Sequence, residues 1–122
     1  MSWFNFPGNS VTSVLLASAS CANTAAATGV GVDLKTYEGP LLIVQNHGTG
    51  TGTLDGKIQD SADNSAFADV AGATFTQSTT TADIKAIALQ SKQVRRYIRY
   101  VGTVGTGPQV VGVSVSGVKK SN

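Results

Sequence analysis

Residues 52–118 constrain the fold of this chain most strongly, because they read as four short strands separated by tight turns. Val111, Val113 and Val115 alternate with glycine and serine, which is the period of two that a strand with one buried face shows. Glycine, threonine and valine are abundant, and together they favour short strands and turns over helices. The segment therefore predicts a β-sandwich, a unit that supplies no catalytic chemistry by itself.

The rest of the chain continues the strand pattern. Residues 11–20 are predicted as the first strand, and the alternation in residues 30–35 indicates a half-buried strand. Residues 41–44 are apolar throughout, which predicts a central strand covered on both faces. Residues 82–90 fit a helical turn and a strand equally well. With seven to nine strands and short connections, we predict an all-β fold, a single antiparallel β-sandwich or jelly-roll-like domain.

A chain of 122 residues is long enough for one domain with one hydrophobic core. No linker divides it, and no internal repeat is visible. We predict an N-terminal arm over residues 1–10, a sandwich domain over residues 11–118 and a polar tail over residues 119–122.

The predicted arm is rich in aromatic side chains. Trp3, Phe4 and Phe6 fall within its first six positions, before a hinge sequence at residues 7–9. Leaving so much aromatic surface in water is unfavourable. We therefore expect the arm to dock, either on its own domain or on a neighbouring subunit.

The chain carries few charges. Charged residues make up 13% of it, the net charge is +2, and Asp33 is the first charged residue. Soluble monomers usually keep a well-charged surface, so the low charge indicates a surface that a partner covers. Nucleic-acid binders are usually more basic, so we predict no nucleic-acid partner. No apolar run approaches the roughly 20 residues of a membrane span, and the basic start of a secretory signal is missing, so we predict neither.

Candidate catalytic and metal-binding residues are sparse. Cys21 is the only cysteine, so an intramolecular disulfide is impossible, and with His47 it makes too few ligands for a cysteine zinc site. His47 has no orienting carboxylate nearby and is expected to be a solvated loop residue. Asp60, Asp63 and Asn64 could supply oxygens to calcium, but ordinary turn chemistry explains them more simply. We predict no catalytic residue, no metal and no cofactor, and so no enzyme.

The glycine-rich segment at residues 48–52 invites comparison with a phosphate-binding loop. That motif needs a lysine and a hydroxyl residue at the start of a helix. Here a predicted strand follows instead, and Lys57 lies too far along the chain. We therefore predict a flexible hairpin loop.

The strong strand predicted at residues 94–104 begins with an unusual cluster of arginine and tyrosine. Arginine and aromatic residues are enriched at protein interfaces, so we favour an interface strand. Two other interpretations stay open: long side chains lying over a sheet, and a nucleic-acid patch with tyrosine for stacking. In a regular strand, Arg95, Tyr97 and Arg99 face one side and Arg96, Ile98 and Tyr100 the other. The interface candidates are Trp3, Phe4, Phe6, Arg95, Arg96, Tyr97, Arg99 and Tyr100.

Two stretches carry a resemblance to a known family: "GTLDGKIQDSADNSAFADVAGATFT" and "QVRRYIRYVGTVGTGPQVVGVSVSGVKK". They resemble small virion proteins of tailed bacteriophages, the capsid decoration or cement proteins. The matching elements are a strand that ends in an acidic turn at residues 59–61, an aromatic residue at Phe67, the strand at residues 96–99 and the valine-rich strand at residues 110–118. The resemblance covers a little over half of the chain.

The resemblance implies a non-enzymatic protein on the outer surface of a capsid, made in the cytoplasm of the host bacterium. Its partner would be the major capsid protein, whose neighbouring copies it would bridge as a homotrimer. Two alternatives stay open: a carbohydrate-binding sandwich module, and a head-completion or tail protein. Carbohydrate-binding modules share the acidic turn, but this chain has Phe67 where a tryptophan often stands.

Overall fold

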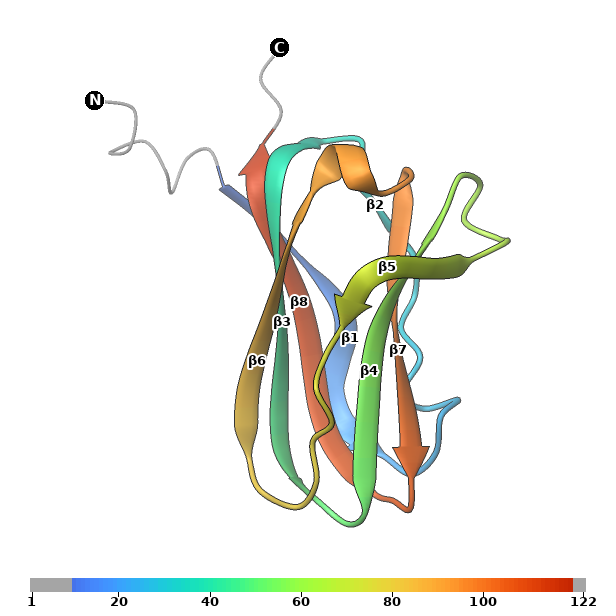
Figure 1. Ribbon diagram of the computed structural model, residues 1–122, viewed down its shortest axis with the longest axis vertical. Helices are drawn as coiled ribbons and strands as arrows, with labels where there is room; N and C mark the ends of the chain where they lie inside the picture. The colour runs from blue at the N-terminus through green and yellow to red at the C-terminus, as the bar shows by residue number, and fades with distance from the viewer. Residues whose placement is uncertain (1–9, 120–122) are drawn as a thin grey trace, which may run out of the picture.

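The structure is a computed structural model that describes residues 10–119, and it consists of two antiparallel sheets packed face to face (Figure 1). The strands are β1 (Ser10–Cys21), β2 (Val32–Asp33), β3 (Tyr37–Gly50), β4 (Thr53–Ser61), β5 (Ala68–Thr74), β6 (Asp83–Gln90), β7 (Tyr97–Gly105) and β8 (Gln109–Lys119), with a short 3-10 turn, η2 (Ser91–Gln93), before β7. One sheet has the strand order β1-β8-β3-β6, and the other has the order β2-β7-β4-β5.

The strand pairs are nested along the chain. β4 pairs with β5, β3 with β6, β2 with β7 and β1 with β8, all antiparallel. Wrapping such a nested set into two sheets produces a jelly roll, in which the first and last strands lie side by side. The predicted all-β sandwich is therefore confirmed, and the ambiguous residues 82–90 form a strand.

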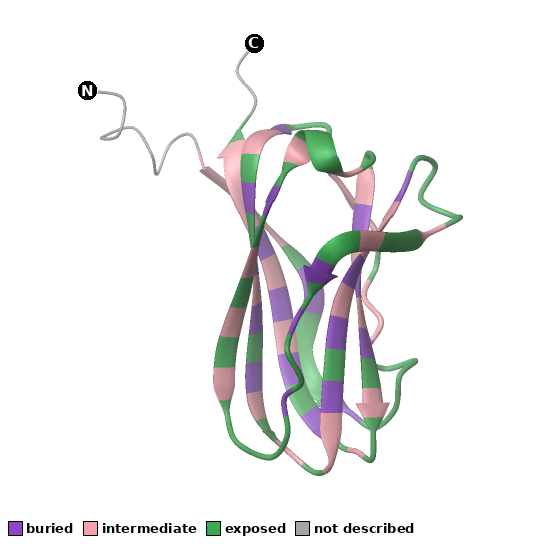
Figure 2. Cartoon of the chain, viewed as in Figure 1, coloured by how far each residue is buried: buried purple, intermediate pink, exposed green. Residues whose placement is uncertain are grey.

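Alternation of large and small residues explains why these strands form a sandwich. On β8, Val111, Val113 and Val115 are buried between the sheets, while Ser114 and Ser116 face outward. Figure 2 shows the same alternation of buried and less buried residues along the long strands. The buried apolar core is Leu15, Leu16, Cys21, Ala27, Leu34, Tyr37, Leu41, Ile43, Leu54, Ile58, Ala73, Phe75, Leu89, Ile98, Tyr100, Val111, Val113 and Val115.

One polar contact lies at the centre of this core. The Tyr100 hydroxyl, on β7, donates a hydrogen bond of 2.6 Å to Oε1 of Gln45, on β3 of the opposite sheet. Gly56 makes room for the pair, because a Cβ at this position would overlap both side chains. Burial raises the pKa of the Tyr100 phenol, which keeps it a neutral donor.

The prediction for residues 41–44 is wrong in one respect. The segment is central, because β3 lies between β8 and β6, but the fold covers only one of its faces. Leu41 and Ile43 are buried, whereas Leu42 is 46% exposed. The apolar residues on the second face therefore lie on the outside of the sandwich in the single chain.

The glycine-rich residues 48–52 do not close a hairpin. β3 ends at Gly50 and β4 begins at Thr53, but these strands belong to different sheets. Gly52 has a φ of +83°, a backbone conformation that residues other than glycine rarely adopt. The segment therefore carries the chain from one sheet to the other.

Two predicted strands have other bounds than expected. Only Val32–Asp33 of residues 30–35 forms a strand, and Val30 is exposed. The strand predicted from residue 94 begins at Tyr97, after the 3-10 turn.

Trp3, Phe4 and Phe6 lie outside the described residues, so the arm and the domain boundaries remain predictions. In residues 10–119, no helix is long and apolar enough to cross a membrane.

We expect Tyr100→Phe to lower the free energy of unfolding by about 1–3 kcal/mol, because it leaves Oε1 of Gln45 without its buried donor. Urea denaturation followed by circular dichroism measures the change. Tyr97→Phe is the matched control, since Tyr97 is only partly buried, and a surface change of this kind stays within about 0.5 kcal/mol. Equal stability of Tyr100→Phe and the wild type would contradict the structural role of this contact.

Candidate functional site

The acidic turn considered for calcium uses its carboxylates internally. The Asp63 carboxylate accepts hydrogen bonds from the backbone N–H groups of Ser65 and Ala66 and from the Ser61 hydroxyl. The backbone bond from Ala66 is the largest of the contacts that lower the pKa of Asp63. The Asp60 carboxylate is paired with Arg95. The contacts of Asp63 confirm the turn interpretation for that residue, whereas Asp60 is held by an ion pair with a distant residue. No cluster of three His, Cys, Asp or Glu that could hold a metal ion occurs among the described residues.

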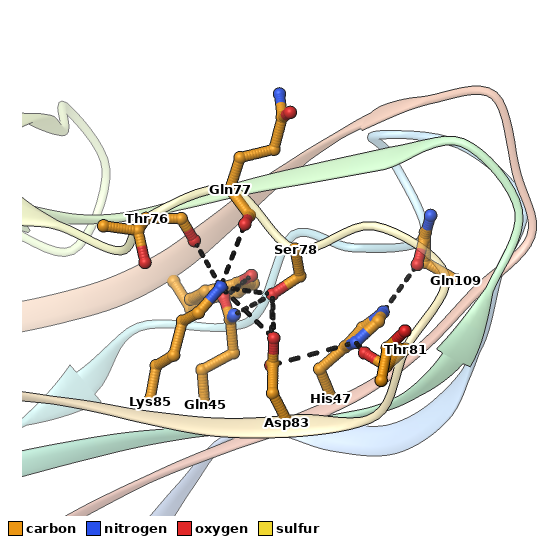
Figure 3. A network of polar contacts seen from close by, with 10 residues as sticks. Gln45, His47, Thr76, Gln77, Ser78, Thr81, Asp83, Lys85 and Gln109 are labelled. Carbon is orange, nitrogen blue, oxygen red and sulfur yellow. Dashed lines mark hydrogen bonds and ion pairs between the residues drawn. The ribbon is translucent and has the colours of Figure 1, made fainter.

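His47 is not the solvated loop residue that we expected, because it is buried and points between the sheets from β3. Its Nε2 lies 2.6 Å from Oε1 of Gln109, and its Nδ1 lies 3.1 Å from the carbonyl oxygen of Thr81 (Figure 3). The Gln109 amide nitrogen donates to the carbonyl of Thr51, which orients its oxygen toward His47. A neutral imidazole has one N–H and donates to one of these oxygens, whereas a protonated ring donates to both.

Lys85 and Asp83, on β6, extend this network (Figure 3). Lys85 Nζ donates to the carbonyl oxygens of Thr76 and Gln77 at 2.9 and 3.0 Å, and to the Ser78 hydroxyl at 2.9 Å. The Asp83 carboxylate lies 3.3 Å from Lys85 Nζ and accepts from the Ser78 hydroxyl at 3.2 Å. The network therefore ties the connection between β5 and β6 to the edge of the sandwich.

The network offers little to a substrate. Ser78 is buried, and its hydroxyl donates to the Asp83 carboxylate and accepts from Lys85 Nζ at 2.9 Å (Figure 3). A nucleophile must be reached by its substrate, whereas this hydroxyl lies inside the fold. Within residues 10–119, every buried side-chain nitrogen and oxygen already has a hydrogen-bond partner. We therefore assign a structural role to the cluster.

Sequence reasoning missed this cluster, although part of its signal was present. Leu41 and Ile43 point inward, and continuing their alternation along β3 places Gln45 and His47 inside as well. The neighbouring glycines instead suggested a loop. The partners Gln109 and Asp83 come from distant strands, and no local pattern identifies them.

The arginine-rich segment before and within β7 forms a charged surface on the other sheet. Arg96 makes two bonds to Asp33, at 3.0 and 2.8 Å, and its guanidinium also lies 5.1 Å from the Tyr97 ring centre. Arg99 lies 4.2 Å above the Phe67 ring and donates to Gln59 at 2.9 Å. These side chains are therefore held by contacts within the chain.

Arg95 is held in the same way, by bonds of 3.1 and 2.9 Å from its guanidinium to Oδ1 of Asp60. With Arg95 and Arg96 each paired to a carboxylate, the segment has less free positive charge than a phosphate-binding patch needs. This argues against the nucleic-acid interpretation.

The structure changes the list of surface residues in one place. Tyr100 is fully buried, so it packs the core and has no surface to offer a partner. The prediction that Arg96, Ile98 and Tyr100 share one side of a strand is wrong for Arg96, which precedes β7 and is exposed while the other two are buried. Arg95, Arg96, Tyr97 and Arg99 remain as described candidates for an interface, whereas Trp3, Phe4 and Phe6 lie outside the described residues.

The outer face of the β1-β8-β3-β6 sheet contrasts with the charged surface. Two rows of paired residues cross it, one formed by Val14, Ser114, Val44 and Ala86, the other by Thr12, Ser116, Leu42 and Ala88. Among the described residues, none in these rows is charged, and four of the exposed large hydrophobic residues lie on this side. We call the residues of the two rows, together with Ile84, Val110 and Gly112, the uncharged face.

Comparison with known proteins establishes the fold class. No protein-family model matches this chain, and no curated protein matches it in sequence. The PBSX exported protein XepA shares the fold with a TM-score of 0.63 and 16% identity, over 92% of this chain and 38% of XepA. The SPBc2 prophage-derived protein YomS has a TM-score of 0.56 and 13% identity, over 91% of this chain and 94% of YomS.

A third similar structure comes from the disulfide-linked pili that form Bacillus endospore appendages. Its TM-score is 0.50 and its identity is 11%, over 93% of this chain and 90% of the pilus protein. The chain is thus similar in fold to an exported protein, a prophage-derived protein and a pilus protein, and it spans 38% of the length of XepA. At these identities the likeness concerns the fold alone.

We expect His47→Leu to lower the free energy of unfolding by about 1–3 kcal/mol, because the imidazole N–H is lost and the buried oxygen that accepts it, Oε1 of Gln109 or the Thr81 carbonyl, is left without that donor. Chemical denaturation measures this loss. Asn46→Leu, at the neighbouring exposed position of β3, should change stability by less than about 0.5 kcal/mol. Similar stabilities of the two variants would argue against the network.

The ion pair of Asp33 and Arg96 predicts an acid-dependent stability. The hydrogen bonds from Arg96 lower the pKa of Asp33 to about 2. Because this pKa lies below the unfolded value of about 3.9, the pair stabilises the fold above that pH, and its contribution is lost as the pH falls toward 2. The melting temperature of Asp33→Asn should therefore lie below that of the wild type at pH 7 and approach it in acid. Arg96→Gln should show the same pH dependence. A melting temperature that stays below that of the wild type in acid would contradict the stabilising role of this ion pair.

Proposed function

We propose that this chain is a non-enzymatic structural protein of a phage particle and that it works by binding other protein subunits. The observation that carries the proposal is the uncharged face. A strand face with Val14, Leu42 and Ile84 open to water is unusual for a soluble monomer, and contiguous apolar surface commonly marks a site of protein association. The uncharged residues behind the low charge of the chain are thus gathered on one side of the fold.

The fold comparisons support the same class of role. One of the similar structures is the prophage-derived protein YomS, another is the PBSX exported protein XepA, and a third builds a pilus. A jelly roll whose buried polar groups are all hydrogen-bonded presents two outer sheet faces, to which neighbouring subunits could bind.

The finer proposal is capsid decoration. In this proposal the protein binds the outer surface of a capsid as a homotrimer and bridges neighbouring major capsid proteins. The described side chains proposed for these contacts are Arg95, Arg96, Tyr97 and Arg99. A ligand that binds only the assembled shell stabilises that shell by mass action, and many symmetric copies multiply a modest contact energy.

The carbohydrate-binding alternative needs an exposed aromatic platform. The Arg99 guanidinium already lies 4.2 Å above the Phe67 ring, and that of Arg96 lies 5.1 Å from the Tyr97 ring centre. A sugar would have to displace a cation from either ring before stacking on the same side. This observation favours protein association over sugar binding.

Light scattering on the purified protein tests the proposal. We expect the wild type to self-associate, and we expect Ile84→Asp to shift the equilibrium toward the monomer because it places a charge in the uncharged face. Thr103→Asp, at an exposed position of β7, is the matched control and should associate like the wild type. A wild-type protein that stays monomeric and fails to bind phage capsids in co-sedimentation would overturn the proposal.

A further inference from the structure

A groove with an apolar lining lies at one end of the uncharged face. It has a volume of about 320 Å³ and lies where β8, β3 and β6 run side by side. Among the described residues, no charged side chain lines it. The lining residues are Pro40, Leu41, Leu42, Ala88, Ser116, Gly117 and Val118.

We infer that this groove binds the aromatic N-terminal segment of the same chain, with the Trp3 or a neighbouring phenylalanine ring inserted between Leu42 and Val118. The inference concerns the isolated chain and does not depend on the proposed virion role. It assigns an occupant to a surface that the jelly roll itself leaves open.

The position of the groove supports this occupant. Ser10, the first residue of β1, pairs with Val118, which lines the groove. The chain therefore enters the fold about one strand spacing, roughly 4.8 Å, from the groove. Nine residues precede Ser10, and an extended segment of that length reaches up to about 30 Å. The segment is therefore long enough to reach the groove.

The chemistry of the segment also matches. Residues 1–9 contain no charged side chain, like the lining of the groove, and they supply Trp3, Phe4 and Phe6. An aromatic side chain buries about 150–250 Å² when it is covered, so an apolar groove is a favourable place for it. Residues 7–9 are Pro-Gly-Asn, a sequence typical of turns, which allows the chain to reverse over the sheet.

The short tether favours the chain's own groove over that of a second copy. A segment joined to its site by a few residues has an effective concentration in the millimolar range. At micromolar protein, a segment from another copy competes poorly unless geometry prevents the intramolecular contact. The expected docking is therefore independent of protein concentration.

Trp3 is the only tryptophan of the chain, so its fluorescence reports directly on the segment. The experiment compares the emission maximum and acrylamide quenching of the full chain with those of a peptide of residues 1–9. We expect a blue-shifted emission and a severalfold lower quenching constant in the full chain, unchanged on serial dilution.

Two variants test the groove itself. Leu42→Asp and Ala88→Asp should each move the emission and quenching toward those of the free peptide, while Thr103→Asp on the other sheet should not. Ala88 is exposed on the edge strand β6, so its variant remains informative if Leu42→Asp unfolds, and circular dichroism checks the fold of each.

Three results would overturn the inference. Peptide-like fluorescence in the wild type would mean that the segment is solvated. Protection that disappears on dilution would mean that it binds a second copy. Protection that both folded groove variants retain would mean that it binds elsewhere. None of these results bears on whether Ile84→Asp changes self-association, so the proposed function is tested separately.

Discussion

The pairing of β8 between β1 and β3 is the contact on which the rest of the structure depends. This last strand joins the beginning of the described chain to its middle, and it completes the sheet that carries the uncharged face. Val111, Val113 and Val115 fill the space between the sheets from β8. Because the pairs are nested, this closure also holds the inner pairs in register.

The two outer faces of the sandwich have opposite chemistry. On one sheet, Arg95, Arg96 and Arg99 are held by carboxylates, an amide and an aromatic ring, so the charges are ordered and largely satisfied. On the other sheet, Leu42 and Ile84 face outward among serine and alanine. This asymmetry, with the interior polar groups bonded to one another, is the basis of the proposed role in binding other protein subunits.

Much of the strand pattern could be predicted, but less of the site. The alternation on β8 and the turn at Asp63 were both predicted correctly, because each depends on residues that are close together in the sequence. His47 was misjudged because glycines beside it suggested a loop. The contacts of Arg96 with Asp33 and of Arg99 with Phe67 join residues far apart along the chain, and local patterns hold no information about such pairs.

The sequence by itself determined the class of fold, since a period of two and glycine-rich turns act within a few residues of each other. Only the tertiary structure decided which side became interior in strands without a clear alternation. Residues 82–90 show why: Ile84 and Ile87 fit a helix or a strand, and pairing with β3 made the segment a strand and turned Ile84 outward. The same pairing exposed Leu42, because a sheet face is buried only when another layer covers it, and this jelly roll has two layers.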